Sequence, residues 1–231
     1  MRVVFLLIAI FVVYCIFLGI RFYSLVSVSA QLVQKAKAYD VRPLQSTQSI
    51  LVLGDSSAVG VGAGKPEDTI AGLLAKKIGA EYVENVAVSG SKTEDVQAQY
   101  EKAALGHYTL ALVMIGGNDI THLVPADTAV SNIKLVLTAL KTRADRVIFI
   151  SAGNIGAATI IPWPFRHYFT VQNLKYHAAF QKLADDIGVE YVNEYAEPSV
   201  DPFILHPETY LATDGFHPSS AGYVLWYERI K

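Results

Sequence analysis

Four short polar segments hold the side chains best suited to chemistry. The first is Gly54-Asp55-Ser56-Ser57, which directly follows the apolar run Ile50-Leu51-Val52-Leu53. Such a run is typical of a buried parallel strand, and open α/β sheets bind ligands at the carboxyl ends of their strands. Each segment alone is also ordinary turn chemistry, but together they supply a nucleophile, a base, a carboxylate and hydrogen-bond donors. The other three segments are Asn85-Val86-Ala87-Val88-Ser89-Gly90, Gly116-Gly117-Asn118-Asp119 and Asp214-Gly215-Phe216-His217-Pro218-Ser219.

Ser56, His217 and Asp214 have the chemical types of a catalytic triad. A serine hydroxyl is a poor nucleophile until a base takes its proton. Histidine is the best base near neutral pH, and it needs a carboxylate to fix its tautomer and stabilise the imidazolium. Asp214 and His217 are three residues apart, so one turn can aim both at a serine. We therefore predict Ser56 as nucleophile, His217 as general base and then acid, and Asp214 as the residue that orients the histidine.

Three groups in the same segments could stabilise an oxyanion. Ser56 offers its own backbone amide, and Gly90 offers another where no side chain blocks the substrate. Asn118 adds a side-chain amide after two glycines that let the backbone turn sharply. We predict Ser56, Gly90 and Asn118 as the oxyanion hole.

The four segments, in this order, resemble the SGNH (GDSL-type) serine hydrolase family over roughly residues 50 to 220. In that family the matching positions carry the triad and oxyanion roles just assigned to Ser56, Asp214, His217, Gly90 and Asn118. The resemblance implies a flavodoxin-like order of five strands and ester hydrolysis through an acyl-serine intermediate. It implies no cofactor and no metal ion.

Other polar residues near these segments are expected to be structural. Asp55 and Asp119 are expected to hold their loops together through local hydrogen bonds rather than to do chemistry. The remaining histidines match no motif and are expected in loops or on the surface; they are His107, His122, His167, His177 and His206.

Strands and helices alternate from residue 50 onward, which predicts an α/β fold. Such alternation requires right-handed crossovers and a parallel sheet covered on both faces, here a flavodoxin-like three-layer α/β/α sandwich. Helices are expected from Pro66, around 130–140, from an N-cap at Thr170, and after Pro218. Strands are expected near 50–54, 82–88, 110–115, 146–151 and 189–193.

Residues 3–20 are uncharged and almost wholly apolar, between Arg2 and Arg21. About 20 apolar residues span a bilayer as a helix, whereas the apolar core of a signal peptide has about 7 to 15. We therefore predict a transmembrane signal-anchor at 1–21, a stalk and linker at 22–49 and a hydrolase domain at 50–231. Cleavage after Val28-Ser29-Ala30 is the alternative.

The charges that flank this segment do not settle its orientation. Arg2 and the terminal amine lie on one side, and Arg21, Lys35 and Lys37 lie on the other. An apolar segment at the start of a chain looks most like an export signal. The catalytic domain is therefore expected outside the cytoplasmic membrane, in the periplasm or at the cell surface.

The composition and one incomplete motif exclude other kinds of site. The only cysteine, Cys15, excludes a disulfide within the chain and a cysteine metal site, and a net charge of −2 argues against a nucleic-acid partner. Residues 60–65 resemble a phosphate-binding loop, but Val59 and Pro66 stand where a Walker loop needs glycine and serine or threonine.

The segment Ile160-Ile161-Pro162-Trp163-Pro164-Phe165 is expected to be irregular because of its prolines, at the sheet edge where the active site opens. It could be a packed crossover loop, an apolar wall for an acyl chain, or a surface that touches the bilayer. With the anchor, it favours a membrane-bound esterase or acyl-hydrolase acting on lipid-like or short-to-medium acyl (thio)esters such as a lysophospholipid. The alternatives are an O-acetyl esterase or acetyltransferase acting on cell-envelope carbohydrate, and a non-catalytic anchored binding module. The oligomeric state stays open.

Overall fold

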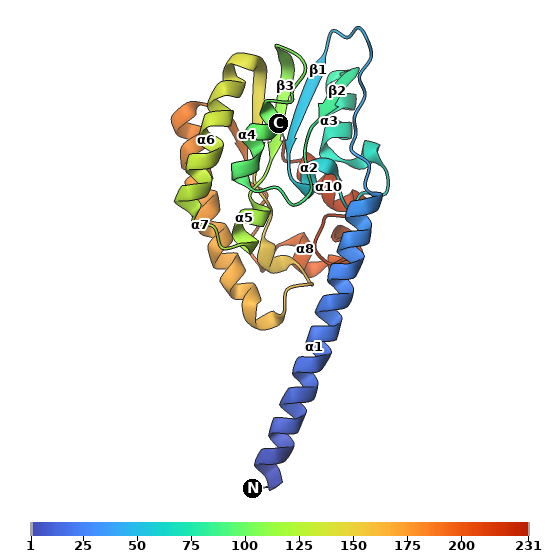
Figure 1. Cartoon of the computed structure of the whole chain (residues 1–231), viewed down its shortest axis with the longest axis vertical. Helices are drawn as coiled ribbons and strands as arrows, with labels where there is room; N and C mark the ends of the chain where they lie inside the picture. Colours follow the sequence, from blue (N-terminus) through green and yellow to red (C-terminus); the bar gives the residue numbers. More distant parts are fainter. Residues whose placement is uncertain (1, 231) are drawn as a thin grey trace.

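The sheet is built from five parallel strands in the order β2-β1-β3-β4-β5, seen in a computed structural model that describes residues 2–230 (Figure 1). The apolar runs form the strands as predicted, except that the second strand ends at Asn85, three residues before its predicted end, and the strand order confirms the flavodoxin-like arrangement. Because all strands are parallel, their carboxyl ends meet at one edge, where the polar segments follow. The strands are β1 Ser49–Gly54, β2 Tyr82–Asn85, β3 Tyr108–Met114, β4 Ala144–Ile150 and β5 Glu190–Val192.

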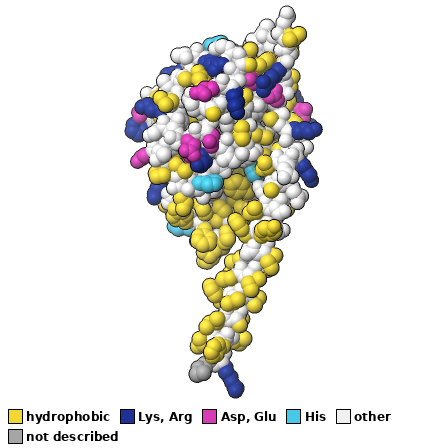
Figure 2. Space-filling view, in the orientation of Figure 1, with side chains coloured by type: hydrophobic (Ala, Val, Ile, Leu, Met, Phe, Trp, Pro, Cys, Tyr) yellow, Lys and Arg dark blue, Asp and Glu magenta, His cyan; other side chains and the backbone are white. Residues whose placement is uncertain are grey.

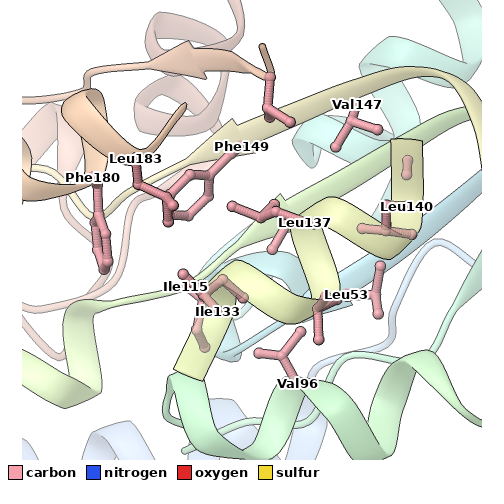
Figure 3. Close-up of a cluster of buried hydrophobic side chains, with 14 of the residues drawn as sticks. Leu53, Val96, Ile115, Ile133, Leu137, Leu140, Val147, Phe149, Phe180 and Leu183 are labelled. Carbon is pink, nitrogen blue, oxygen red and sulfur yellow. The ribbon is translucent and has the colours of Figure 1, made fainter. Parts of the chain in front are cut away.

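Two apolar cores, one on each face of the sheet, hold the helices in place. Alternate side chains of a strand point to opposite faces, so in β1 Leu51 and Leu53 join one core while Ile50 and Val52 join the other. The first core packs α4 Val96–Tyr100, α6 Ala126–Arg143 and α7 Trp163–Ile187, as Figure 3 shows for Val96, Leu137 and Phe180. The second packs α3 Ile70–Ile78 and α10 Ser220–Tyr227. The remaining short helices are α2 Ser56–Val59, α5 Gly117–Thr121, α8 Pro202–Leu205 and α9 Pro207–Tyr210.

Two predicted helix starts are wrong. Pro66 opens a short 3₁₀ turn, Pro66–Asp68, and α3 begins only at Ile70 with Thr69 as its N-cap. Thr170 lies inside α7, which begins seven residues earlier at Trp163. Pro162 precedes the helix and Pro164 lies in its first turn, where the missing N–H would have no partner within the helix. The prolines of this segment therefore start a helix rather than prevent one.

The apolar amino-terminal segment belongs to one helix, α1 Arg2–Lys35, which projects from the domain (Figure 1). Its apolar residues are exposed along the projecting part (Figure 2). Within the described residues it is the single helix that is long and apolar enough to cross a membrane, and a signal sequence would meet the same test. The helix continues without interruption past residue 21 into the predicted stalk.

The chain after α1 is attached to the domain rather than free. Val41 forms an antiparallel bridge with Val83 of β2. Arg42 pairs with Asp40 at 2.7 Å and with the buried carboxylate of Glu84 at 3.3 Å. Residues 40–42 therefore pack against the outer strand of the sheet.

Candidate active site

Ser56 lies at the carboxyl end of β1, in a turn that only glycine allows. Gly54 has a φ of +140°, and a Cβ atom built on it would lie 1.9 Å from the carbonyl oxygen of Met114 in β3. This close approach packs the turn against the neighbouring strand. The amide of Asp55 then donates to the same Met114 oxygen at 3.0 Å, so Ser56 begins α2 from a fixed position.

Asp55 is the N-cap of α2 and has the structural role that the sequence predicts. Its Oδ1 accepts hydrogen bonds from the Ser57 amide at 2.9 Å and from the Ser57 hydroxyl at 2.7 Å. Burial raises the pKa of Asp55 to about 6, although both bonds from Ser57 act to lower it. Asp119 also has a structural role, but its hydrogen bonds are not local as predicted: it accepts from the amide and hydroxyl of Thr93, 26 residues earlier, and so joins two loops.

Ser56, His217 and Asp214 form one continuous chain of hydrogen bonds. The Nε2 atom of His217 lies 2.8 Å from the Ser56 hydroxyl oxygen. Its Nδ1 atom lies 2.6 Å from Oδ2 of Asp214. All three side chains are buried, Asp214 completely. This is the geometry in which histidine can take the serine proton while a carboxylate fixes the other ring nitrogen.

Asp214 is held in its ionised form by the turn that contains it. Its Oδ1 accepts from the backbone amides of Phe216 at 3.0 Å and His217 at 3.1 Å. Burial acts to raise the pKa of Asp214, but these bonds and the contact with the His217 ring together hold it below its ordinary value. The carboxylate is therefore available to stabilise an imidazolium at neutral pH.

A second glycine, Gly62, allows the loop after Ser56 to pack against the turn that carries His217. Gly62 follows α2 with a φ of +95°, and a Cβ atom there would lie 2.3 Å from the Pro218 carbonyl oxygen and 3.2 Å from Cβ of His217. The loop after the serine thus lies directly against the turn that carries the histidine. Among the glycines that look like part of a phosphate loop, Gly62 serves this close contact, whereas Gly60 allows the chain to pack against Thr69.

Two of the predicted oxyanion donors, Asn118 and Gly90, differ in their position relative to the cavity beside Ser56. Asn118 lines the same cavity as Ser56 and His217, and its Nδ2 donates to the Ser91 carbonyl at 2.9 Å. An amide nitrogen carries two hydrogens, so a second donor is left for a substrate. Gly90, one residue before Ser91, lies in an exposed turn with a φ of +88° and is not among the residues that line the cavity. Its role as a donor stays a prediction.

The cavity beside Ser56 is small and mostly apolar. Its volume is about 70 Å³. One wall is Asn118 with Gly117, and another is the Asp-His turn with Phe216. Several lining residues were not predicted, because they come from segments that carry no motif: Asn154, Ala157, Ala158, Leu211 and Trp226.

Gln99 of α4 also supports the site and was not predicted. Its Oε1 accepts from the Gly54 amide at 2.7 Å, and its Nε2 donates to the Gly54 carbonyl at 2.9 Å and to the Ser91 hydroxyl at 3.0 Å. The side chain therefore joins the turn before the serine to the loop that holds Asn118. The one signal in the sequence was a glutamine on a buried helix face.

His177 contradicts its predicted place on the surface. It is buried in α7, where Nδ1 lies 2.9 Å from the Ser151 hydroxyl and 2.6 Å from the Tyr191 hydroxyl. Burial lowers the pKa of His177 to about 4, so the ring is neutral at physiological pH. The helical spacing that buries Phe180 and Leu183 buries this histidine too. Two hydroxyl groups contact Nδ1 of its ring, and the side-chain amide of Asn173 lies 3.3 Å from Nε2.

Glu194 is a buried carboxyl group in the loop that follows β5. Its nearest cation is Nε of Arg229 at 3.5 Å, and in the described part of the chain neither oxygen accepts a hydrogen bond. Burial raises the pKa of Glu194 to about 8, and Arg229 lowers it only in part. The folded protein therefore holds this group neutral over a pH range in which the unfolded chain ionises it.

Replacing Glu194 with glutamine is expected to stabilise the protein at neutral and higher pH. Between about pH 4.5 and 8 the folded state holds a proton that the unfolded state has lost. The wild-type free energy of unfolding therefore falls by up to about 1.4 kcal/mol per pH unit as the pH rises, whereas Glu194→Gln lacks this loss. Urea unfolding at pH 5, 6.5 and 8 measures the gap between the two proteins. A gap that stays constant with pH would contradict the assignment.

A serine activated by histidine at the carboxyl edge of a parallel sheet is the arrangement of the serine-dependent hydrolases. Residues 52–225 match the GDSL-like lipase/acylhydrolase family, and the chain belongs to this family. The resemblance drawn from the four polar segments is thereby confirmed.

One curated relative and many solved structures are similar to this chain, two of the structures being from Veillonella parvula and Streptomyces albidoflavus. A GDSL-like esterase of Mycobacterium tuberculosis is 25% identical over 189 residues, which is 76% of this chain and 58% of that protein. The chain thus spans somewhat over half the length of that relative. A lipolytic G-D-S-L family member from Veillonella parvula aligns with a TM-score of 0.64 at 14% identity, covering 79% of this chain and 96% of that one. Phospholipase A1 from Streptomyces albidoflavus aligns with a TM-score of 0.60 at 18% identity, covering 78% and 96%. At these identities the two structures confirm the fold.

Proposed function

We propose that the protein is a membrane-anchored serine esterase that cleaves carboxylic esters through an acyl-serine intermediate. The observation that carries this proposal is the hydrogen-bond chain from Ser56 through His217 to Asp214. Ser56 Oγ attacks the carbonyl carbon while His217 takes its proton, and the amides of Ser56, Gly90 and Asn118 receive the oxyanion. The bond to the alcohol oxygen then breaks, and His217 protonates that oxygen as it leaves. Water, activated by the same histidine, releases the acid and restores the serine.

A lipid-like acyl ester is the substrate class that the surroundings favour. An apolar groove of about 680 Å³ lies between α1 and residues 160–169, and Phe216 lines both this groove and the catalytic cavity. Volumes of about 300 to 1,000 Å³ are usual for ligand sites. The GDSL-like lipase/acylhydrolase family and the phospholipase A1 neighbour agree with this class.

The amino-terminal helix is proposed to stay attached as an anchor, with residues 3–20 in the bilayer and the catalytic domain from residue 50 on the extracytoplasmic side. Two contacts beyond the apolar segment support retention. The Arg21 guanidinium donates to the Thr159 carbonyl at 3.1 Å, and residues 22–34 form one wall of the apolar groove. Cleavage after Ala30 would remove the Arg21 contact and most of this wall, leaving only Val33 and Gln34 of its lining residues.

Hydrolysis of p-nitrophenyl esters from acetyl to palmitoyl tests this function. The full chain in a neutral detergent is compared with its Ser56→Ala variant. Activity that depends on Ser56 and rises with acyl length would support the lipid-like substrate class. Equal rates on all chain lengths would contradict it and leave the esterase proposal standing.

Action on O-acetyl groups of envelope carbohydrate, by hydrolysis or transfer, is the second candidate. The volume of about 70 Å³ beside Ser56 favours it, because the cavity itself accommodates only a short acyl group. Activity confined to acetyl esters and acetylated sugars in the same assays would select this function.

Asn118→Ala is expected to lower kcat by roughly 10²–10³, the usual cost of removing one oxyanion donor. KM is expected to change little, because the amide donates mainly to the charge that develops in the transition state. Steady-state kinetics on p-nitrophenyl acetate measures both constants. Asn132→Ala is a suitable control, since this amide donates to Thr93 outside the cavity. A kcat for Asn118→Ala close to that of the control would exclude the assignment.

A further inference from the structure

The apolar groove is formed jointly by the amino-terminal helix and the segment that begins α7. Phe216, the residue before the catalytic histidine, closes it toward the cavity, with its ring 5.1 Å from that of His217. Figure 2 shows a hollowed apolar face at the end of the domain nearest α1. The main apolar residues of its two walls are Phe22, Val26 and Val33 of α1 and Ile161, Phe165 and Phe169 opposite.

The groove lies at the level where α1 would leave a bilayer. A helix of 34 residues is about 51 Å long at about 1.5 Å per residue, whereas a hydrocarbon core is about 30 Å thick. Residues 3–20 fill that thickness, so the wall from Phe22 onward begins at the interface. Phe165 of the groove wall is exposed, as are Trp163 and Tyr168 in the same first two turns of α7, and exposed aromatic residues are common at a membrane surface.

Two arginines converge on one carbonyl oxygen beside the groove. Nη2 of Arg21 lies 3.1 Å and Nη2 of Arg166 lies 3.5 Å from the oxygen of Thr159. Within residues 2–230 no carboxylate comes within ion-pair distance of either guanidinium. Burial, together with the nearby charge of Arg21, lowers the pKa of Arg166. Two like charges held together without a carboxylate form a site suited to a phosphate group.

The arginine pair is connected to the catalytic turn through Thr159. The Thr159 hydroxyl donates to the Gly215 carbonyl at 3.5 Å, and the Ile160 amide donates to the same oxygen at 3.2 Å. Gly215 lies between Asp214 and His217 in the chain. A phosphate on the arginines, an acyl chain in the groove and an ester at Ser56 would thus all lie around one turn.

We propose that the substrate is a lipid with one acyl chain and a phosphate headgroup, whose chain lies in the groove against α1 and whose phosphate binds Arg21 and Arg166. The inference rests on the esterase function proposed above. It makes the membrane anchor a wall of the substrate site. A lipid would enter from the bilayer surface without passing through water.

Removal of the arginine charges tests the headgroup site. The full chain in neutral detergent is assayed on 1-acyl-glycerol-3-phosphate and on monoacylglycerol with the same chain. The double variant R21Q/R166Q is expected to lose about 10- to 100-fold in kcat/KM on the phosphate substrate, since hydrogen bonds between charged groups are lost. Its activity on monoacylglycerol is expected to stay within about twofold, because no phosphate is involved. The double variant K134Q/K175Q, at exposed positions of α6 and α7, is the charge-matched control.

A matched pair of serines on α1 tests the groove. Ser29 lines the groove, whereas Ser27, two residues away, is exposed and does not. Ser29→Trp fills the groove and is expected to reduce hydrolysis of both long-chain substrates while p-nitrophenyl acetate is cleaved at the wild-type rate. Ser27→Trp is expected to leave all three rates unchanged.

The same assays distinguish an error in the headgroup site from an error in the esterase function. If wild-type activity depends on Ser56 but R21Q/R166Q treats both lipids as the wild type does, the headgroup site is wrong and the esterase stands. If no ester is cleaved, the esterase function is wrong. Binding of an ether-linked lysophosphate analogue still tests the site in that case, and equal affinity for wild type and R21Q/R166Q would overturn it.

Discussion

Replacing Ser56 with alanine is expected to remove nearly all ester hydrolysis, with a loss in kcat of about 10⁴- to 10⁶-fold. The hydroxyl is the one nucleophile within hydrogen-bond distance of His217 in the described chain, at 2.8 Å. Removing it costs one hydrogen bond, so the free energy of unfolding is expected to change by about 1 kcal/mol or less. Steady-state kinetics and urea unfolding on the same preparations separate lost chemistry from lost structure.

Ser57→Ala is the matched control for this experiment. Ser57 follows in the same turn, but its hydroxyl donates to Asp55 rather than to the histidine. It is expected to keep most of the activity. An organophosphonate that labels nucleophilic serines should modify wild type and Ser57→Ala and leave Ser56→Ala unmodified, as intact-mass spectrometry would show. Labelling that survives in Ser56→Ala would disprove the assignment of the nucleophile.

Asp214→Asn is expected to lower kcat by about 10⁴-fold without loss of the fold. The carboxylate accepts from Nδ1 of His217 at 2.6 Å and fixes the tautomer that leaves Nε2 free to take the serine proton. An amide can donate to Nδ1 instead and stabilise the wrong tautomer. Kinetics on p-nitrophenyl acetate measures the loss, and a decrease of less than tenfold would show that His217 is oriented by something else.

Asp214→Asn is also expected to change how the free energy of unfolding depends on pH. Because the pKa of Asp214 is held below its ordinary value, its ionised form stabilises the folded state above the unfolded pKa of about 3.9. This contribution is lost as the pH falls through the folded pKa. The stability difference between wild type and Asp214→Asn is therefore expected to be largest near neutral pH and to shrink below about pH 4. Asp55→Asn is the contrasting variant: because burial raises the pKa of Asp55 to about 6, its stability difference from wild type is expected to change with pH in the opposite direction.

The sequence predicted the site best where reactive side chains lie next to a recognisable strand or turn pattern. The apolar run at 50–53 and the polar turn after it were sufficient to predict β1 and the position of Ser56. The spacing of Asp214 and His217 predicted a turn that aims both side chains in one direction, and their contacts with each other and with Ser56 agree. These features depend on neighbours in the chain, which a sequence displays directly.

Features built from distant segments could not be predicted. The groove joins residues 22–34 to residues 160–169, and its cationic edge needs Arg21 to meet a carbonyl 138 positions away. The Gln99 contacts with Gly54 likewise depend on how α4 packs on the sheet. His177 was misplaced because a histidine on an apolar helix face has no local sign of the hydroxyl groups that satisfy it.

The bridge between Val41 and Val83 affects the tendency of the domain to associate with other copies of itself. β2 is an outer strand, and an uncovered outer strand offers free N–H and C=O groups to the strands of other molecules. Val41 occupies two of these groups, with bonds of 2.9 and 2.7 Å, and Arg42 places a charge beside them. A chain shortened to begin near residue 45 would lose this cover and expose the unpaired backbone groups of β2, which favours aggregation. Residues 40–42, within the predicted linker, thus protect the sheet edge against self-association. A soluble form of the domain should retain them.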